Sequence, residues 1–303
     1  MKILLTGSTG QLGQDILKRF SKKYYFFKPS RKELDLTRLD YCELYLEKIK
    51  PDIIINCAAY TEVDKAEIDI NNAYIVNAYA PELFANHVSK FGGKLLHIST
   101  DFVFDGNKNK PYSPSDKRNP INVYGKSKAL GEELIELKLG GSGQAIILRT
   151  SWLMSNVGKN FNTTMINLLT NKEIISVVND QLGSPTFTNS LSLVCSQIIK
   201  LNFFETLEAI SSKTSVPILH WAEDGPASWY EVALEISKLM KNMKISNKIA
   251  KVIPISSMDY PTLAIRPSYS VLGCESTKKF LNLKSVFWRD SLKKILIYKK
   301  NQI

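Results

Sequence analysis

The sequence contains few cysteines and no pattern that would use them together. Its four cysteines, Cys42, Cys57, Cys195 and Cys274, are widely separated, and none lies in a Cys-x-x-Cys pair. Neither a disulfide framework nor a zinc site is therefore expected. Free thiols are typical of a reducing compartment, so we expect a cytoplasmic protein.

Long apolar runs and basic runs with interleaved aromatics are also missing. No apolar stretch reaches the roughly 20 residues that a membrane-spanning helix needs, and the apolar run near Met1 is too short for a signal peptide. The formal net charge of +11 comes mainly from lysines spread along the chain, without a nucleic-acid-binding motif. We therefore expect neither a membrane nor a nucleic acid as partner, although a positive field suits small anions.

Strand and helix patterns alternate through the first half of the chain. This alternation predicts an α/β fold, with a doubly wound parallel sheet over residues 1–150. Residues 151–303 are expected to form mainly a smaller, mixed α/β lobe, with some segments returning to the first domain. The expected strands are 2–6, 24–28, 53–57, 94–99 and 145–149, and the expected helices are 11–21, 38–49 with Thr37 as N-cap, 71–91 and 124–139. Further helical stretches are expected near 161–170, 189–201, 229–243 and 289–298.

A glycine-rich turn joins the first expected strand to the first helix. Glycine at three positions permits a tight turn, close backbone approach and close packing of helix on strand. The helix N-terminus is then free to face a pyrophosphate. Because the turn lies in a strand–turn–helix context, it predicts a Rossmann-type dinucleotide site. The residues expected to contact the dinucleotide here are Gly7, Gly10, Gln11, Leu12 and Gly13.

The end of the second strand bears on the choice of dinucleotide. An acidic residue at this position would bind the ribose of NAD, whereas this chain has Arg31 in a basic segment. Arg31 could hold a 2′-phosphate, so NADPH is expected to be preferred or at least accepted beside NADH; a solvated loop is the alternative. Asp35 and Leu36 are expected near the adenine. The small residues Cys57, Ala58 and Ala59 end a central strand, where backbone would lie against the cofactor.

Tyr124 and Lys128 lie four positions apart in an expected helix, so their side chains share one face. An ammonium there is expected to lower the phenol's pKa from about 10, allowing the phenol to exchange a proton with an alcohol. Tyr24 and Lys28 have the same spacing, but in an expected strand they would be about 13 Å apart rather than about 6 Å. Thr100 follows a strand and should emerge at the sheet's carboxyl end.

The Gly-x-x-Gly-x-x-Gly spacing together with Thr100, Tyr124 and Lys128 resembles the extended short-chain dehydrogenase/reductases. Over nearly the whole chain, the sequence is similar to a narrower family, the dTDP-4-dehydrorhamnose reductases. Segments that carry this resemblance are 56–67 (like NAAAYTAVDKAE), 99–106 (STDYVFDG), 122–128 (NVYGKTK), 149–152 (RTSW), 179–186 (NDQxGxPT) and 260–270 (YPTPxxRPxxS). Phe102 and Cys57 replace a tyrosine and an alanine of the family pattern.

The resemblance implies NAD(P)H-dependent reduction of the 4-keto group of dTDP-4-dehydro-L-rhamnose. It implies that Tyr124 protonates the developing alkoxide, that Thr100 holds the carbonyl oxygen, and that Lys128 binds the nicotinamide ribose and lowers the tyrosine pKa. The expected substrate-binding residues are Thr100, Asp101, Trp152 beside the sugar and Arg266 facing the diphosphate. A core tryptophan and a structural ion pair are the alternatives for the last two.

Other activities of the same superfamily stay open at this point. They are reduction of another nucleotide-linked 4-keto-deoxysugar, epimerisation or dehydration, and a non-catalytic regulatory subunit like that of methionine adenosyltransferase. A dehydratase is expected to place an acidic pair after the threonine, whereas only Asp101 is present. Some family members use Mg²⁺ for dimerisation or activity. The sequence supplies no evident metal cluster, so Mg²⁺ and a homodimer are left open.

Overall fold

The computed structural model describes residues 1–20, 24–200 and 215–300, and its centre is a parallel sheet. The six strands lie in the order β10-β5-β4-β3-β1-β2, and all neighbouring pairs are parallel, which confirms the expected sheet. Their bounds are β1 (Lys2–Thr6), β2 (Tyr25–Phe27), β3 (Ile53–Asn56), β4 (Lys94–Thr100), β5 (Ala145–Thr150) and β10 (Ile218–His220).

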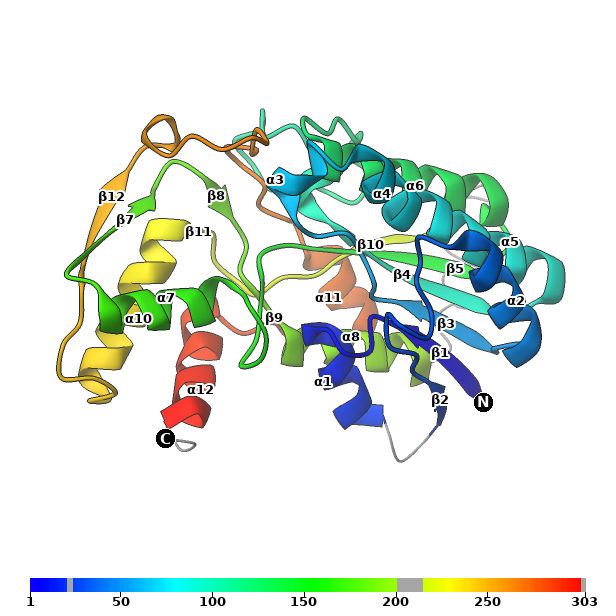
Figure 1. Cartoon of the computed structure of the whole chain (residues 1–303), viewed down its shortest axis with the longest axis horizontal. Helices are drawn as coiled ribbons and strands as arrows, with labels where there is room; N and C mark the ends of the chain where they lie inside the picture. The colour runs from blue at the N-terminus through cyan, green and yellow to red at the C-terminus, as the bar shows by residue number, and fades with distance from the viewer. Residues whose placement is uncertain (21–23, 201–214, 301–303) are drawn as a thin grey trace.

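Helices cover both faces of this sheet (Figure 1). One face carries α2 (Leu39–Ile49), α5 (Ala80–Phe91) and α6 (Val123–Leu139), and the other carries α1 (Gln11–Phe20), α8 (Thr188–Lys200) and α11 (Glu275–Leu281). Successive residues of a strand point to opposite faces, so both faces must be apolar. In β3, for example, Ile54 packs in the α2–α5–α6 layer while Ile53 and Ile55 pack in the α1–α8 layer.

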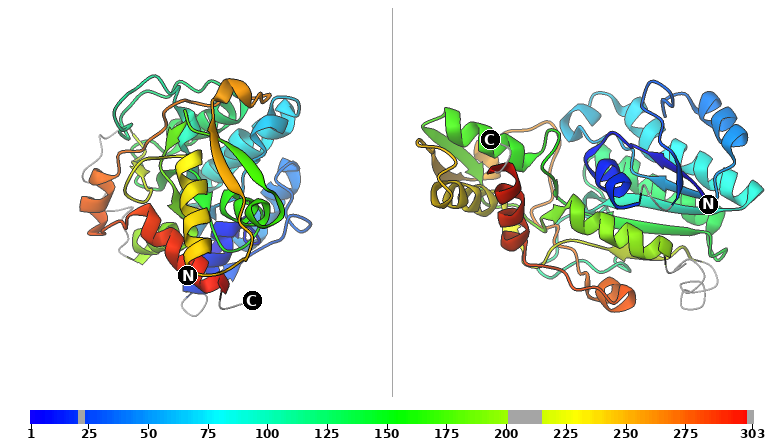
Figure 2. Two further views of the ribbon diagram at one scale, coloured as in Figure 1. Left: turned by 90° about the vertical axis from the view of Figure 1, so that its left-hand side faces the viewer. Right: turned by 90° about the horizontal axis from the view of Figure 1, so that it is seen from below.

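A second lobe with its own apolar core lies at one end of the sheet (Figures 1 and 2). It contains α7 (Phe161–Asn171), β7 (Ile174–Val178), α10 (Trp229–Asn242), β12 (Lys251–Ile255) and α12 (Trp288–Lys300). Short ladders join β7 to β12, β6 (Leu153–Met154) to β9 (Thr186–Phe187), and β8 (Leu182–Gly183) to β11 (Ala227–Ser228). The lobe is not continuous in sequence, because α8 and β10 pack with the central sheet.

The single helix expected over 71–91 is divided in the structure. It consists of α4 (Ile70–Tyr74), a π-helix (Ile75–Tyr79) and α5. The short helix α3 (Val63–Ala66) precedes α4 in the chain. Pro81 in the first turn of α5 has no N–H to donate, which favours a local change of hydrogen bonding. The division places the side chain of Asn77 where it accepts from Tyr60 N and donates to Ser127 Oγ.

Other boundaries differ by one or two residues from those expected. Thr37 does not cap α2: Arg38 occupies the N-cap position, and the Thr37 N–H and hydroxyl both donate to Asp35 instead. Ser21 and Leu201, the latter the expected end of a helix from 189, lie outside the described residues. Within the described ranges, no helix is both long enough and apolar enough to cross a membrane.

Candidate active site

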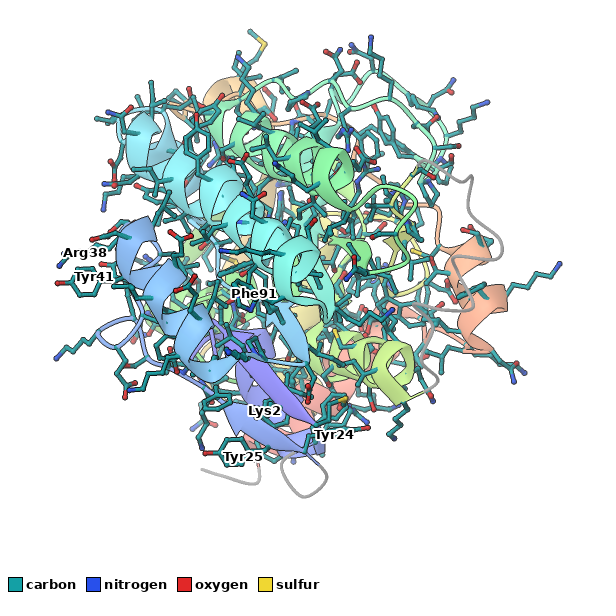
Figure 3. The ribbon with its side chains drawn as sticks, turned by 90° about the vertical axis from the view of Figure 1, so that its right-hand side faces the viewer. Lys2, Tyr24, Tyr25, Arg38, Tyr41 and Phe91 are labelled. Carbon is teal, nitrogen blue, oxygen red and sulfur yellow. The ribbon has the colours of Figure 1, made fainter. Side chains whose placement is uncertain are left out.

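The carboxyl ends of the central strands and the second lobe enclose a cavity of ≈ 760 Å³. Its walls include every residue that the sequence predicts for catalysis and cofactor binding, together with three of the four predicted substrate residues, Thr100, Asp101 and Trp152. These residues are Gly7, Gly10, Gln11, Leu12, Gly13, Arg31, Asp35, Leu36, Cys57, Ala58, Ala59, Thr100, Asp101, Tyr124, Lys128 and Trp152. Tyr24 lies elsewhere, beside Lys2 and Tyr25 at the amino ends of β1 and β2 (Figure 3).

The glycine turn between β1 and α1 has the close backbone contacts that a dinucleotide cradle needs. Gly7 has φ +65°, and a Cβ on it would lie 2.8 Å from Ala58 N. A Cβ on Gly13 would lie 2.3 Å from Gly7 O, so α1 packs directly on the turn. Helix α1 begins at Gln11, and the turn and the first residues of the helix line the cavity together. This arrangement fits a pyrophosphate at a helix N-terminus.

Arg31 reaches the cavity at the expected adenine end. Its side chain is 82% exposed, with Nε 4.0 Å from Asp35 Oδ1. Hydrogen bonds from the N–H and hydroxyl of Thr37 help to hold the pKa of Asp35 below its usual value, so this carboxylate is charged. Because the distance to Asp35 is long and the side chain is largely exposed, the Arg31 guanidinium is only loosely paired and can turn to a phosphate at the cavity edge.

Tyr124 and Thr100 meet because β4 and α6 converge at the cavity. Thr100 is the last residue of β4, and Tyr124 is in the first turn of α6. The side chain of Asn122 caps α6 by accepting from Gly125 N at 2.7 Å. A Cβ on Gly125 would lie 2.2 Å from Phe102 O, so the start of this helix crosses the chain just after β4. The phenol and the threonine hydroxyl thus share one corner of the cavity.

Lys128 does not lower the pKa of Tyr124, and this expectation from the sequence is wrong. Burial raises the pKa of Tyr124 to about 12, the Thr100 hydroxyl lowers it, and the Asp101 carboxyl raises it. The Lys128 amine instead donates to Ile98 O at 2.8 Å and lies 3.2 Å from His97 Nε2. Burial lowers the pKa of Lys128 to about 8. Because the pKa of Tyr124 lies far above neutral pH, its phenol is protonated there, and the protonated phenol is the form that donates a proton.

Asp101 is a buried acid beside the reacting corner. The Thr100 hydroxyl donates to its Oδ1 at 3.2 Å. Burial raises the pKa of Asp101 to about 7, against the opposing effects of the Ser270 and Thr100 hydroxyls. Its carboxyl therefore changes charge close to neutral pH.

A buried ion pair supports α6 behind Lys128. Arg149 Nη2 donates to Glu132 Oε2 at 2.6 Å, and both side chains are almost fully buried. Ser99 and Arg118 also donate to Glu132. Burial alone would raise the pKa of Glu132, but Arg149 and these other donors hold it below its usual value. Arg149, the first residue of the Arg-Thr-Ser-Trp segment, is thus structural.

Trp152, Phe161 and Trp229 form an aromatic wall on the side of the second lobe. Trp152 adopts φ +45°, a strained conformation for a non-glycine residue. Its ring stacks on Trp229 with centroids 3.5 Å apart and planes 6° apart, and the Phe161 centroid lies 4.5 Å from that of Trp229. A Cβ on Gly183 would lie 2.4 Å from Trp152 Cε2, so this glycine makes room for the indole. Trp152 therefore borders the cavity rather than filling the core.

Arg266 is not brought into the cavity. Its guanidinium forms two hydrogen bonds with the Asp64 carboxylate, at 2.9 and 2.6 Å, and a third with Ala264 O at 2.9 Å. The Arg266 side chain holds the pKa of Asp64 below its usual value. This geometry matches the structural ion pair considered from the sequence, and a role at a diphosphate stays a prediction.

Sequence reasoning missed His97 and Trp229. A signal existed for His97, because it is a polar residue inside an otherwise apolar strand, as Asn56 is in the neighbouring one. For Trp229 no local signal existed, since its stacking partner is far away in the chain. In the described part of the chain, no group of three or more His, Cys, Asp or Glu side chains could hold a metal ion.

Comparison with known proteins assigns the chain to a protein family. The family model described as "RmlD substrate binding domain" matches residues 1–300. The chain belongs to this family. The resemblance to dTDP-4-dehydrorhamnose reductases seen in the sequence is thereby confirmed.

Named relatives match over almost their full length. A dTDP-4-dehydrorhamnose reductase of Aggregatibacter actinomycetemcomitans is 37% identical over 98% of this chain and 99% of its own. Among solved structures, the enzyme of that name from Clostridium acetobutylicum has a TM-score of 0.88 at 34% identity, covering 99% and 100%. The one from Bacillus anthracis, in complex with NADP, has a TM-score of 0.84 at 32% identity, covering 98% and 99%.

Proposed function

We propose that this chain reduces the 4-keto group of dTDP-4-dehydro-L-rhamnose with NADPH or NADH, giving dTDP-L-rhamnose. The observation that carries the proposal is the meeting of Thr100, Tyr124 and Lys128 at the wall of a cavity that the glycine turn also lines. The family and the names of its full-length relatives supply the nucleotide-sugar substrate.

The residues of the cavity can perform the acid–base part of this reaction. When bound, the reduced nicotinamide supplies a hydride to C4 of the sugar. Thr100 is placed to hold the ketone oxygen, and Tyr124 to give its phenolic proton to the oxygen as negative charge develops there. The raised pKa of Tyr124 keeps that proton available at neutral pH. Lys128 is placed to bind a ribose hydroxyl of the dinucleotide.

The two walls of the cavity have different roles. Residues 1–150 bind the dinucleotide and carry the chemistry, with Arg31 at the 2′-phosphate. Residues 151–303 mainly bind the nucleotide sugar, with Trp152 against the sugar ring. We also propose a cytoplasmic location, which the four free thiols support, and a homodimer, which sedimentation would test.

The test supplies dTDP-4-dehydro-L-rhamnose, made enzymatically, and follows oxidation of NADPH and of NADH by the purified protein. We expect oxidation of the cofactor with dTDP-L-rhamnose as the product, identified by NMR. Lack of oxidation with both cofactors would contradict the proposal. Faster turnover of a 4-keto-deoxysugar on another nucleotide would transfer it to that substrate.

A further inference from the structure

A chain of buried polar side chains runs beneath the cavity. Thr6 is in register with Asn56 on the next strand, and Asn56 with His97, so the three lie side by side on one face of the sheet. Thr6 Oγ1 donates to Asn56 Oδ1 at 2.6 Å, Asn56 Nδ2 lies 3.0 Å from His97 Nδ1, and His97 Nε2 lies 3.2 Å from Lys128 Nζ. All four residues are at most 2% exposed. The first and last residues of this hydrogen-bonded series, Thr6 and Lys128, both line the cavity.

The His97 ring has one proton with which to satisfy two neighbours. Burial, reinforced by Lys128, holds the pKa of His97 well below its ordinary value, so the ring is neutral and has a single N–H. If the Asn56 amide donates to Nδ1, the proton is on Nε2, and Lys128 must accept it as a neutral amine. If Lys128 is an ammonium, it donates to Nε2, the proton is on Nδ1, and the Asn56 carboxamide must turn to accept it.

We propose that His97 is a positioning residue for Lys128, and that its tautomer follows the charge of that amine. When Asn56 turns, its amide donates to Thr6, which also accepts from Ala58 N at 3.3 Å. The charge of Lys128 is thereby coupled to the direction of the Thr6 hydroxyl at the dinucleotide end of the cavity. Only the catalytic consequence rests on the proposed function, through the role given there to Lys128.

The other groups around Lys128 do not adapt in this way. Ile98 O accepts from the amine in either charge state. Glu132, one turn further along α6, is bound to Arg149 and Arg118 and stays charged. Burial raises the pKa of the Cys57 thiol well above its ordinary value, so it stays neutral. Tyr124 and Asp101 face the cavity beside Lys128, but no hydrogen bond joins either to Nζ in the described structure.

The protein supplies its own control in His220, one of its three histidines. His220 is also fully buried, with Nδ1 3.1 Å from Tyr112 O and Nε2 3.4 Å from Arg149 Nη1. A carbonyl only accepts, and arginine stays charged, so His220 should keep its proton on Nδ1 throughout. His97 differs in having a carboxamide that can turn and a cation that titrates.

The direct test needs no substrate. In protein labelled with ¹⁵N-histidine and ¹³C-lysine, NMR reports which ring nitrogen carries the proton while the Lys128 ε-carbon reports its charge. As pH rises through the pKa of Lys128, about 8, His97 should change from Nδ1–H to Nε2–H with the same midpoint, while His220 stays unchanged. The His97→Gln variant lacks the His97 ring, so the ¹⁵N signals missing from its spectrum are those of His97. One fixed His97 tautomer while Lys128 titrates would overturn the proposal.

The kinetic test compares His97→Leu with His97→Gln. If the ammonium form is active, kcat falls as pH rises through the pKa of Lys128. Loss of the acceptor in His97→Leu should move this alkaline limb down by about one pH unit and lower kcat at pH 8 by about fivefold. In His97→Gln the amide oxygen of the glutamine can accept from Lys128 in place of Nε2. This variant should therefore restore most of the kcat and most of the position of the alkaline limb.

A merely structural role would lower stability or NADPH affinity without moving the pH profile. A parental pH profile in His97→Leu, or equal impairment of the two variants, would overturn the proposal. An inactive parent protein would instead defeat the proposed function, and the tautomer measurement would still decide the role of His97.

Discussion

The two walls of the cavity are held in place by different physical means. On the sheet side, the glycine turn and Thr100 lie at the ends of hydrogen-bonded strands, whose register fixes their positions. The aromatic wall rests on ring stacking, on the strained backbone of Trp152 and on the space left by Gly183. The contrast suits a site in which chemistry needs fixed geometry while recognition needs a surface shaped by packing. Each variant below should therefore affect one wall and spare the other.

Tyr124→Phe should have the largest effect, because it removes the proton donor and keeps the ring. We expect kcat to fall by about 10²–10⁴-fold, while NADPH affinity, measured by fluorescence titration, stays near that of the parent. Activity close to the parent would remove Tyr124 from its assigned role. A matched loss of cofactor binding would show that the variant had damaged the fold instead.

Gly183→Ala should disturb the aromatic wall, since its Cβ would lie 2.4 Å from the Trp152 ring. Overpacking costs about 1–3 kcal/mol, so we expect the KM for the nucleotide sugar to rise by roughly 5- to 150-fold with little change in NADPH binding. Gly273→Ala is the control, because its Cβ would lie 3.2 Å from Tyr112 O, away from the cavity. Equal effects of the two substitutions would count against this explanation.

Trp229→Leu should loosen Trp152 without touching the sheet side. Loss of a stacked pair worth about 0.5–1.5 kcal/mol predicts a roughly 2- to 13-fold rise in the KM for the nucleotide sugar. Trp229→Phe retains an aromatic face and should recover part of the loss. An unchanged KM in Trp229→Leu would mean that the stack does not position Trp152.

Arg31→Gln should have the smallest effect, because the side chain is largely exposed. We expect the KM for NADPH to rise by up to about fivefold, and that for NADH to stay constant. Lys32→Gln, which removes a neighbouring exposed charge outside the cavity wall, is the control. The same change for both cofactors would show that Arg31 does not bind the 2′-phosphate.

Much of the sheet side could be predicted from the sequence. A glycine turn between strand and helix has few possible geometries, and a strand-end threonine must emerge at the carboxyl edge. The four-residue spacing of Tyr124 and Lys128 gave their shared face correctly but not where the ammonium goes. That depends on His97 and Ile98 O, which only the fold brings to it.

The other features depend on contacts between distant segments. The Trp152–Trp229 stack and the Arg266–Asp64 ion pair join residues from separate parts of the chain, and no local pattern encodes either. The π-helix before α5 reflects Pro81 together with the packing of Asn77 against Ser127. Periodicity alone predicted a regular helix there.

The most direct measurement follows the hydride itself. The protein is incubated with dTDP-4-dehydro-L-rhamnose and NADPH that carries deuterium at both C4 positions of the nicotinamide, and the product is analysed by NMR. The account predicts dTDP-L-rhamnose with deuterium at C4 of the sugar, formed by the parent protein and almost absent with Tyr124→Phe. A product without deuterium at C4, or no product from the parent protein, would contradict it.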